Sequence, residues 1–203
     1  WLSYRAIEIG MCPVRALRVA YTGELGWELH HPIEMQNYLL DILLSSGKEF
    51  NLKLVGARAQ NWLRQEKSYK AFGSDLGRDA GPFESNLSRF VDINKNFLGK
   101  DALLKKNPEV SCVTLLIDGP KDIDPWGREA LYNETEDSML GRLTSAGYSV
   151  HFKRSIGIGY VKSSFSEVGT KLRIKIDDAF WNAEIVRDSP YDPQNERIID
   201  RVQ

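Results

Sequence analysis

The sequence predicts an α+β fold, in which a part that mixes helices and strands over residues 1–107 is followed by a small antiparallel β-barrel over residues 108–203. The first observation is a helical period in residues 34–46, where apolar side chains recur at i, i+3, i+4, i+7 and i+8. The second is a change after Pro108 to short β-branched runs, which glycines and charged turns separate and which carry no helical period. A domain boundary is therefore expected near residue 107.

Two strands of the first part are expected to form a hairpin. They cover residues 14–21 and 27–30, and the glycines between them, Gly23 and Gly26, are typical of a turn. The other elements expected in this part are the helix over 34–46, a helix over 56–71, a short strand over 88–94 and a short helix over 100–106.

The second part is expected to be a compact antiparallel unit over residues 108–187 without long helices. Its strands are expected where β-branched or alternating runs occur between turn residues. These runs cover residues 110–117, 128–133, 140–148, 156–162, 171–176 and 180–187.

Composition excludes several classes of protein. Of the 203 residues, 42% are apolar and 27% are charged, which is typical of a folded globular chain. The net charge of −1 argues against a nucleic-acid binder, and no apolar run approaches the roughly 20 residues that span a membrane. Cys12 and Cys112 are the only cysteines, which indicates a reducing compartment, and with three histidines they show no zinc-site spacing.

Common cofactor and nucleophile motifs are absent from the sequence. No G-x-G-x-x-G follows a strand, no G-x-x-x-x-G-K-[ST] occurs, and no G-x-S-x-G marks a serine nucleophile. We therefore expect this chain to hold no flavin and to have no oxidase activity of its own.

Residues 21–29, YTGELGWEL, place Glu24 and Glu28 around a glycine turn. Glu28 lies in an apolar strand, where we expect a buried, ordered carboxylate. Such a carboxylate can accept two parallel N–H bonds from a guanidinium or an aminopyrimidine edge. The alternative is that both glutamates are exposed hairpin residues, which pair with Arg15 or Arg18.

Residues 56–70, GARAQNWLRQEKSYK, place Arg64 on a helix with many apolar neighbours. The simplest interpretation is a surface salt-bridge face, since Glu66 and Lys70 are spaced i, i+4.

Taken together, these segments resemble the aminomethyltransferase (glycine-cleavage T-protein) superfamily. The resemblance rests first on YTGELGWE at 21–28, LRQEK at 63–67 and FGSD at 72–75. It continues in order over nearly the whole chain, in PFE at 82–84, NFLGKDAL at 96–103, LTSAGYS at 143–149, IGYV at 158–161 and PYDP at 190–193.

Within the superfamily, the chain resembles the C-terminal half of dimethylglycine and sarcosine dehydrogenases. The matching segments are ELGWEL at 24–29, EKSYKA at 66–71 and PYDPQNER at 190–197. The resemblance implies part of a T-protein-like folate-binding core followed by the barrel.

The resemblance also implies site residues. Tyr21 is similar to the family's tyrosine beside the folate, and Glu28 to the carboxylate that binds the pterin, with Leu29 and His30 continuing along the ligand. Arg89 departs from the pattern, since it stands where dimethylglycine dehydrogenases often place a tyrosine, and a role in stacking on or pairing with the glutamate of folate is still open to it.

Two other features depart from the family pattern. Gln60 stands where the T-protein has an arginine. The family's catalytic aspartate belongs to an earlier part of the fold, and Asp75 matches a different, loop position, so the resemblance implies no catalytic residue within this chain.

The function implied by the resemblance is one-carbon transfer to tetrahydrofolate, which gives 5,10-methylenetetrahydrofolate. The implied partners are folate and an iminium that a separate FAD-containing part makes from an N-methyl amine. Trp1 falls inside a continuing pattern of polar and apolar residues, so we expect the chain to be a fragment of a longer protein. We expect the fragment alone to be inactive. The expected compartment is a bacterial cytoplasm or a mitochondrial matrix.

Two other hypotheses stay open at this point. The chain also resembles the regulatory subunit of pyruvate dehydrogenase phosphatase, which predicts a non-catalytic scaffold. A folate-binding module of the tRNA-modification type is disfavoured, because the Lys-Gly-Cys-Tyr motif of that type is missing.

Overall fold

The structure is a computed structural model that describes residues 1–119, 123–135 and 138–199. These residues form two compact units. Unit 1 combines residues 1–63 with the chain from Asp192 onward, and unit 2 runs from Arg64 to Tyr191. These compact units divide the chain after Leu63 and before Asp192. The domain boundary expected near residue 107 stays a prediction.

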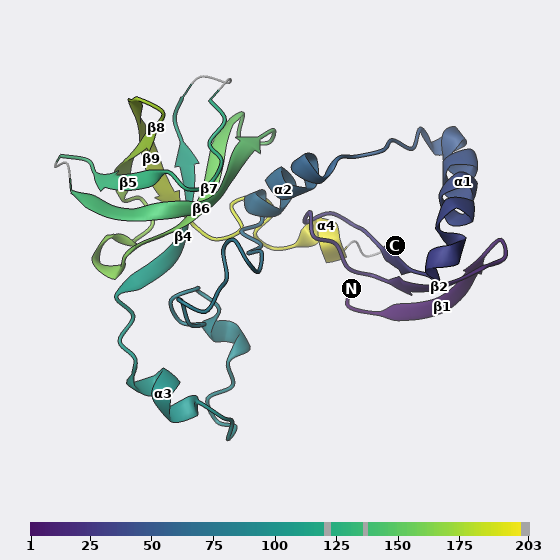
Figure 1. The fold of residues 1–203 in the computed structure, drawn as a ribbon, viewed down its shortest axis with the longest axis horizontal. Helices are drawn as coiled ribbons and strands as arrows, with labels where there is room; N and C mark the ends of the chain where they lie inside the picture. The colour runs from purple at the N-terminus through teal and green to yellow at the C-terminus, as the bar shows by residue number, and fades with distance from the viewer. Residues whose placement is uncertain (120–122, 136–137, 200–203) are drawn as a thin grey trace. The chain divides into compact units, whose positions relative to one another are not determined.

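Unit 1 is built on a three-stranded antiparallel sheet in the order β1-β2-β3 (Figure 1). Its strands are β1 (Tyr4–Ile9), β2 (Cys12–Leu17) and β3 (Glu28–His30). The hairpin expected between the segments around 14–21 and 27–30 is confirmed by the pairing of β2 with β3. The hairpin of β1 with β2 is an addition that the sequence did not indicate.

One face of this sheet packs on α1 (Gln36–Gly47). Cys12, Val14 and Ala16 alternate along β2 as buried residues and form a core with Leu39. The other apolar positions of the helical period pack against the same core, and they are Met35, Tyr38, Ile42 and Leu43. The helix predicted over 34–46 is therefore confirmed, with a 3-10 turn η1 (Ile33–Met35) at its start and η2 (Lys48–Phe50) at its end.

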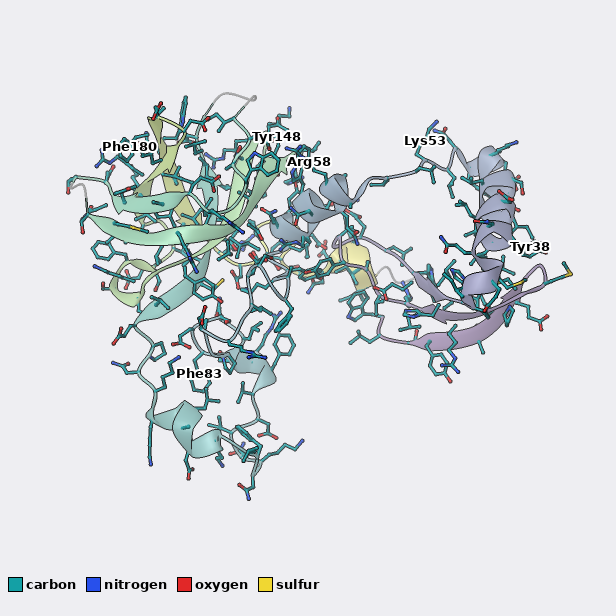
Figure 2. All side chains as sticks on the ribbon, in the orientation of Figure 1. Tyr38, Lys53, Arg58, Phe83, Tyr148 and Phe180 are labelled. Carbon is teal, nitrogen blue, oxygen red and sulfur yellow. The ribbon has the colours of Figure 1, made fainter. Side chains whose placement is uncertain are left out.

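The β1–β2 turn is fixed by a close approach to α1. Gly10 has a φ of +60°, and a Cβ at this position would overlap the hydroxyl of Tyr38. That hydroxyl accepts a hydrogen bond from the Met11 N–H at 3.1 Å, and Figure 2 labels Tyr38 beside the hairpin. Only glycine combines this backbone conformation with this close contact.

The helix α2 (Ala57–Glu66) is shorter than the predicted helix over 56–71. It ends because the chain turns at Ser68, whose φ is +54°. The Ser68 side chain shares a hydrogen bond with Thr114 at 2.7 Å and accepts one from the Ser189 N–H at 2.9 Å. Contacts from far along the sequence thus end the helix.

Unit 2 contains a closed antiparallel barrel in the order β4-β7-β6-β5-β8-β9 (Figure 1). The fold class and the compact β unit predicted from the sequence are thereby confirmed. Leucine, isoleucine, valine and alanine side chains form its core, and every strand of the barrel contributes at least one of them. The strands of the described part are β4 (Val110–Ile117), β5 (Ala130–Asn133), β6 (Met139–Ser149), β7 (Arg154–Lys162), β8 (Lys171–Ile176) and β9 (Ala179–Val186).

The remaining elements are short. They are α3 (Lys100–Lys105), η3 (Ser88–Phe90), η4 (Ser163–Phe165) and α4 (Glu196–Ile199). The strand predicted over 88–94 is wrong, because this segment forms η3 and then an irregular stretch with no strand partner in the described part.

The segments at the start and at the end of unit 2 are hydrogen-bonded to each other. The Tyr191 N–H donates to the carbonyl oxygen of Glu66 at 3.1 Å. The Ser189 hydroxyl donates to the carbonyl oxygen of Lys67 at 2.8 Å. The chain therefore enters and leaves this unit at one place.

The described residues lack two features. None of their helices has the length and apolar character that crossing a membrane requires. They also contain no group of three or more His, Cys, Asp or Glu side chains that is placed to hold a metal ion.

Candidate functional site

The sheet of unit 1 presents its polar residues on the face that α1 does not cover. Along β3, Glu28 and His30 are exposed, while Leu29 between them packs into the core on the other side. His30 lies opposite Arg15 of β2 in the strand register. The sheet thus brings Glu28 and His30 together, and it separates Leu29 from them.

The carboxylate of Glu28 lies 3.3 Å from His30, measured between Oε2 and Nε2. Within the described part of the chain its other oxygen, Oε1, accepts no hydrogen bond, and neither Arg15 nor Arg18 pairs with it. The two side chains are 55% and 57% exposed. The expected burial of Glu28 is therefore wrong, because β3 is a three-residue edge strand that is paired on one side only.

A groove of about 780 Å³ follows this open face of the sheet. Its polar lining comes from Glu8, Arg15, His30 and His31. The Nδ1–H of His31 donates to the carbonyl oxygen of Pro32 at 2.8 Å, so the other ring nitrogen, Nε2, takes no part in this hydrogen bond. The groove therefore offers both charge types and imidazole nitrogens, and Glu28, which does not line it, is linked to it through the contact with His30.

The other predicted site residues lie in different settings. Tyr21 is 36% exposed and belongs to the loop between β2 and β3. Arg89 is an exposed residue of η3 in unit 2, where its guanidinium lies 4.7 Å from the ring centre of Phe90. Gln60 is an exposed amide of α2 in unit 1.

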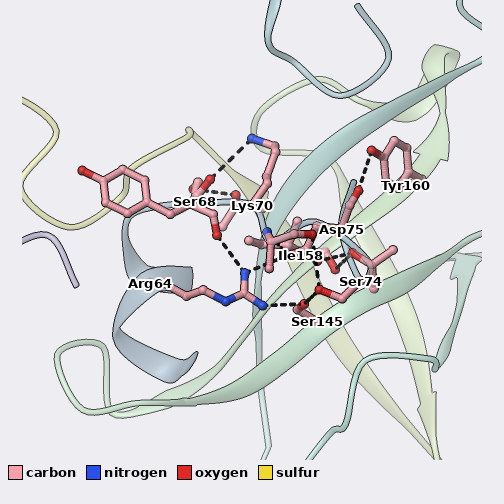
Figure 3. A network of polar contacts seen from close by, with 12 residues as sticks. Arg64, Ser68, Lys70, Ser74, Asp75, Ser145, Ile158 and Tyr160 are labelled. Atoms are coloured by element: carbon pink, nitrogen blue, oxygen red, sulfur yellow. Dashed lines mark hydrogen bonds and ion pairs between the residues drawn. The ribbon is translucent and has the colours of Figure 1, made fainter. Parts of the chain in front are cut away.

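A buried polar network in unit 2 was not predicted as such (Figure 3). The Arg64 side chain is 4% exposed, and its Nη1 donates to Oδ2 of Asp75 at 2.7 Å. The same Nη1 donates to the carbonyl oxygen of Tyr69 and Nη2 to the hydroxyl of Ser145, both at 2.7 Å. Thr144 completes the set by donating its hydroxyl to Oδ1 of Asp75 at 2.6 Å.

The expected surface pair between Glu66 and Lys70 is wrong. Glu66 ends α2 and is 3% exposed, and its carboxylate accepts hydrogen bonds from the Ser149 hydroxyl and the His151 N–H. Lys70 lies beyond the helix and donates to Asp188 at 3.4 Å. Both side chains tie the end of α2 to the barrel, because α2 does not continue to residue 70.

Burial also governs two ionisable groups at the barrel wall. It raises the pKa of the Cys112 thiol to about 12, and it raises the pKa of Tyr160 to about 12. The Tyr160 hydroxyl donates to the carbonyl oxygen of Asp75 at 2.8 Å and shares a hydrogen bond with Ser85 at 2.9 Å. Neither group is poised to act as a base near neutral pH.

We predict that iodoacetamide leaves both cysteines unmodified at pH 8 in the folded chain. Cys12 and Cys112 are 0% and 3% exposed, and the thiolate of Cys112, which is the reactive form, is scarce well below a pKa of about 12. Mass spectrometry should find no adduct on the folded chain and two adducts on the chain unfolded in urea. An adduct on folded Cys112 would contradict the burial described here.

Two family models match the chain. The GCVT N-terminal domain matches residues 1–95, and the glycine cleavage T-protein C-terminal barrel domain matches residues 111–192. Together they cover both the sheet with its open face and the closed barrel.

Curated relatives match most of this chain but only part of their own length. Mitochondrial dimethylglycine dehydrogenase of Homo sapiens is 34% identical over 93% of the chain, which spans 22% of that protein. An aminomethyltransferase of Caldanaerobacter subterraneus is 32% identical over 83% of the chain, which spans 45% of that protein.

A solved structure shares the fold. Aminomethyltransferase T of the glycine cleavage system from Bartonella henselae superposes with a TM-score of 0.78 at 24% identity, over 89% of this chain and 50% of that one. The family models, the relatives and the fold agree: the chain belongs to the aminomethyltransferase (glycine-cleavage T-protein) superfamily.

Proposed function

We propose that this chain is the tetrahydrofolate-binding, one-carbon transfer region of a dimethylglycine- or sarcosine-dehydrogenase-like protein that forms 5,10-methylenetetrahydrofolate. The observation that carries the proposal is the carboxylate of Glu28, which keeps one uncommitted oxygen and contacts His30, a residue that lines the groove of unit 1. The similarity to dimethylglycine dehydrogenase and to aminomethyltransferases supports the reaction class.

The residues present fit the pterin end of folate. The pterin N3–H and 2-amino group are neighbouring donors, and an ionised carboxylate accepts two parallel N–H bonds. The groove of about 780 Å³ lies within the range of about 300–1,000 Å³ that is usual for small-molecule sites.

In this proposal, Glu28 accepts the two pterin N–H groups, and His30 orients the carboxylate through the 3.3 Å contact. Tyr21 lies against the folate, and Leu29 supports the strand from the core. The role of Arg89, a residue of unit 2, toward the glutamate of folate stays a prediction. Tetrahydrofolate, when bound, supplies the two amines that accept the one-carbon unit. The residues of this chain bind and orient it, and we place the catalytic aspartate of the family outside residues 1–203.

The remaining parts of the proposal concern the parent protein. A flavin part with FAD would oxidise an N-methyl amine and deliver the iminium to this region. The compartment would be a bacterial cytoplasm or a mitochondrial matrix, and the similarity to a mitochondrial dehydrogenase and to bacterial aminomethyltransferases supports this pair.

Glu28→Ala in the complete parent is expected to weaken tetrahydrofolate binding by about tenfold, while amine oxidation by the flavin part stays nearly unchanged. Charge-assisted hydrogen bonds contribute roughly 1.5–3 kcal/mol each, which the desolvation of an exposed carboxylate partly offsets, and about 1.4 kcal/mol is a factor of ten. Calorimetric titration of tetrahydrofolate into the parent measures the difference.

The matched control is Glu8→Gln, which removes a carboxylate that lines the groove of unit 1 and should keep the affinity within about twofold of the wild type. Equal affinities for wild type and Glu28→Ala would remove Glu28 from the site. No binding to the wild type would overturn the proposal in favour of a non-catalytic scaffold.

A further inference from the structure

A second groove lies in unit 2, and its lining includes none of the residues assigned to folate. It is formed by the segment 73–80 and by β4, β6 and β7, and it has a volume of about 460 Å³. We call it the loop–barrel groove. Its apolar lining includes Leu76, Val110 and Met139, and its charged rim includes Asp79 and Arg142.

The loop–barrel groove has a fixed wall, because the buried network holds the segment 73–80 in place. Asp75 accepts a hydrogen bond from the Ala71 N–H at 2.9 Å as well as from Arg64 and Thr144. The Tyr160 hydroxyl donates to the carbonyl oxygen of Asp75 at 2.8 Å. A groove whose walls are held in this way is formed before a ligand arrives.

Glycines leave the mouth of the groove open. A Cβ added at Gly73 or Gly77 would meet no other atom within 4 Å. On the floor, a Cβ at Gly141 would overlap the carbonyl oxygen of Tyr160, so β6 and β7 approach closely there. The space is therefore bounded by backbone and short side chains rather than filled by long ones.

Two charges of opposite sign at the rim are uncommitted. Within the described residues, neither the guanidinium of Arg142 nor the carboxylate of Asp79 forms a hydrogen bond or an ion pair. The carboxylate of Asp75, by contrast, is fully neutralised by Arg64. Among the described residues, a ligand that enters this groove therefore meets the free cation of Arg142, the free anion of Asp79 and an apolar wall.

We propose that the loop–barrel groove binds a free amino acid with an apolar side chain, whose carboxylate pairs with Arg142 and whose ammonium pairs with Asp79. The apolar side chain then lies against Leu76, Val110 and Met139. This inference does not depend on folate binding by unit 1. Since both ion pairs are exposed, the expected Kd for L-leucine is on the order of 1–10 mM.

The chain offers a direct probe of this groove, because it has three methionines and only Met139 lines it. With the methionine methyls labelled with ¹³C, titration of L-leucine should shift the Met139 signal saturably. The signals of Met11 and Met35, both in unit 1, should stay in place. 4-Methylpentanoate lacks the ammonium and 3-methylbutylamine lacks the carboxylate, so each should bind about fivefold or more weakly than leucine.

Arg142→Gln and Asp79→Asn should each weaken leucine binding by about fivefold. The matched controls are Arg187→Gln and Asp178→Asn, which remove the same charges from exposed positions of unit 2 outside the groove and should leave the affinity unchanged. An unshifted Met139 signal at roughly ten times the expected Kd would overturn the proposal. So would equal binding of leucine and its singly charged analogues, or an equal loss of affinity in the controls.

Discussion

Replacing Asp75 with asparagine is expected to lower the free energy of unfolding of unit 2 by about 3–5 kcal/mol, because it leaves the buried guanidinium of Arg64 without its counter-charge. The side chains of the pair are 4% and 0% exposed. Three donors also converge on the Asp75 carboxylate, and an amide cannot accept from all of them. Urea unfolding followed by circular dichroism measures the change.

The exposed pair of Arg154 with Asp118 provides the control. Its N–O distance of 2.6 Å is as short as that of the buried pair, but its side chains are 36% and 61% exposed. Asp118→Asn should therefore cost less than about 1 kcal/mol. If the two substitutions lowered the free energy of unfolding equally, the burial of Arg64 would add nothing to the stability that its ion pair provides.

Gly141→Ala is expected to destabilise the barrel by about 2–3 kcal/mol. The added methyl would overlap the carbonyl oxygen of Tyr160 on the neighbouring strand, and a backbone atom in a closed barrel has little freedom to move away. Thermal unfolding of unit 2 should show a lowered midpoint.

Gly77→Ala provides the comparison, since a Cβ at that position meets nothing within 4 Å. Its effect should stay within about 0.5 kcal/mol. Equal midpoints for Gly141→Ala and the wild type would show that β6 and β7 can separate locally at no cost.

The spacing of apolar residues predicted those helices and strands whose formation depends on residues close together in the sequence. The helix around 34–46 and the strands after Pro108 follow from residue spacing, and the structure confirms them. The strand at Tyr4–Ile9 was missed because its outer face is exposed and its pattern carries few buried apolar positions. The opposite error occurred at 88–94, where an alternating run has no neighbouring strand in the described part to pair with.

The buried network could not be predicted from spacing, because its partners lie far apart in the sequence. Arg64 meets Ser145, which is 81 residues away, and Asp75 meets Thr144, which is 69 residues away. Within the helix, Arg64 and Glu66 look like ordinary surface charges. Only the closed barrel converts them into buried groups, which need partners.

The candidate site was predicted in part. The resemblance placed Glu28, Leu29 and His30 together along the ligand, whereas alternation along β3 puts Glu28 and His30 on one face and Leu29 on the other, as in any strand. The exposure of Glu28 depends instead on the position of β3 at the edge of its sheet, and no residue within 27–30 encodes that position.

The hydrogen bond between Tyr191 and Glu66 holds the two ends of the barrel unit next to each other. A segment whose ends meet adds almost no loop-closure cost to the chain around it, however many residues it contains. Adjacent ends of this kind also permit circular permutation, in which the old ends are joined and new ones are opened in a surface turn. Evolution can therefore exchange or reorder this unit as one piece, while the sheet of the other unit keeps its own register.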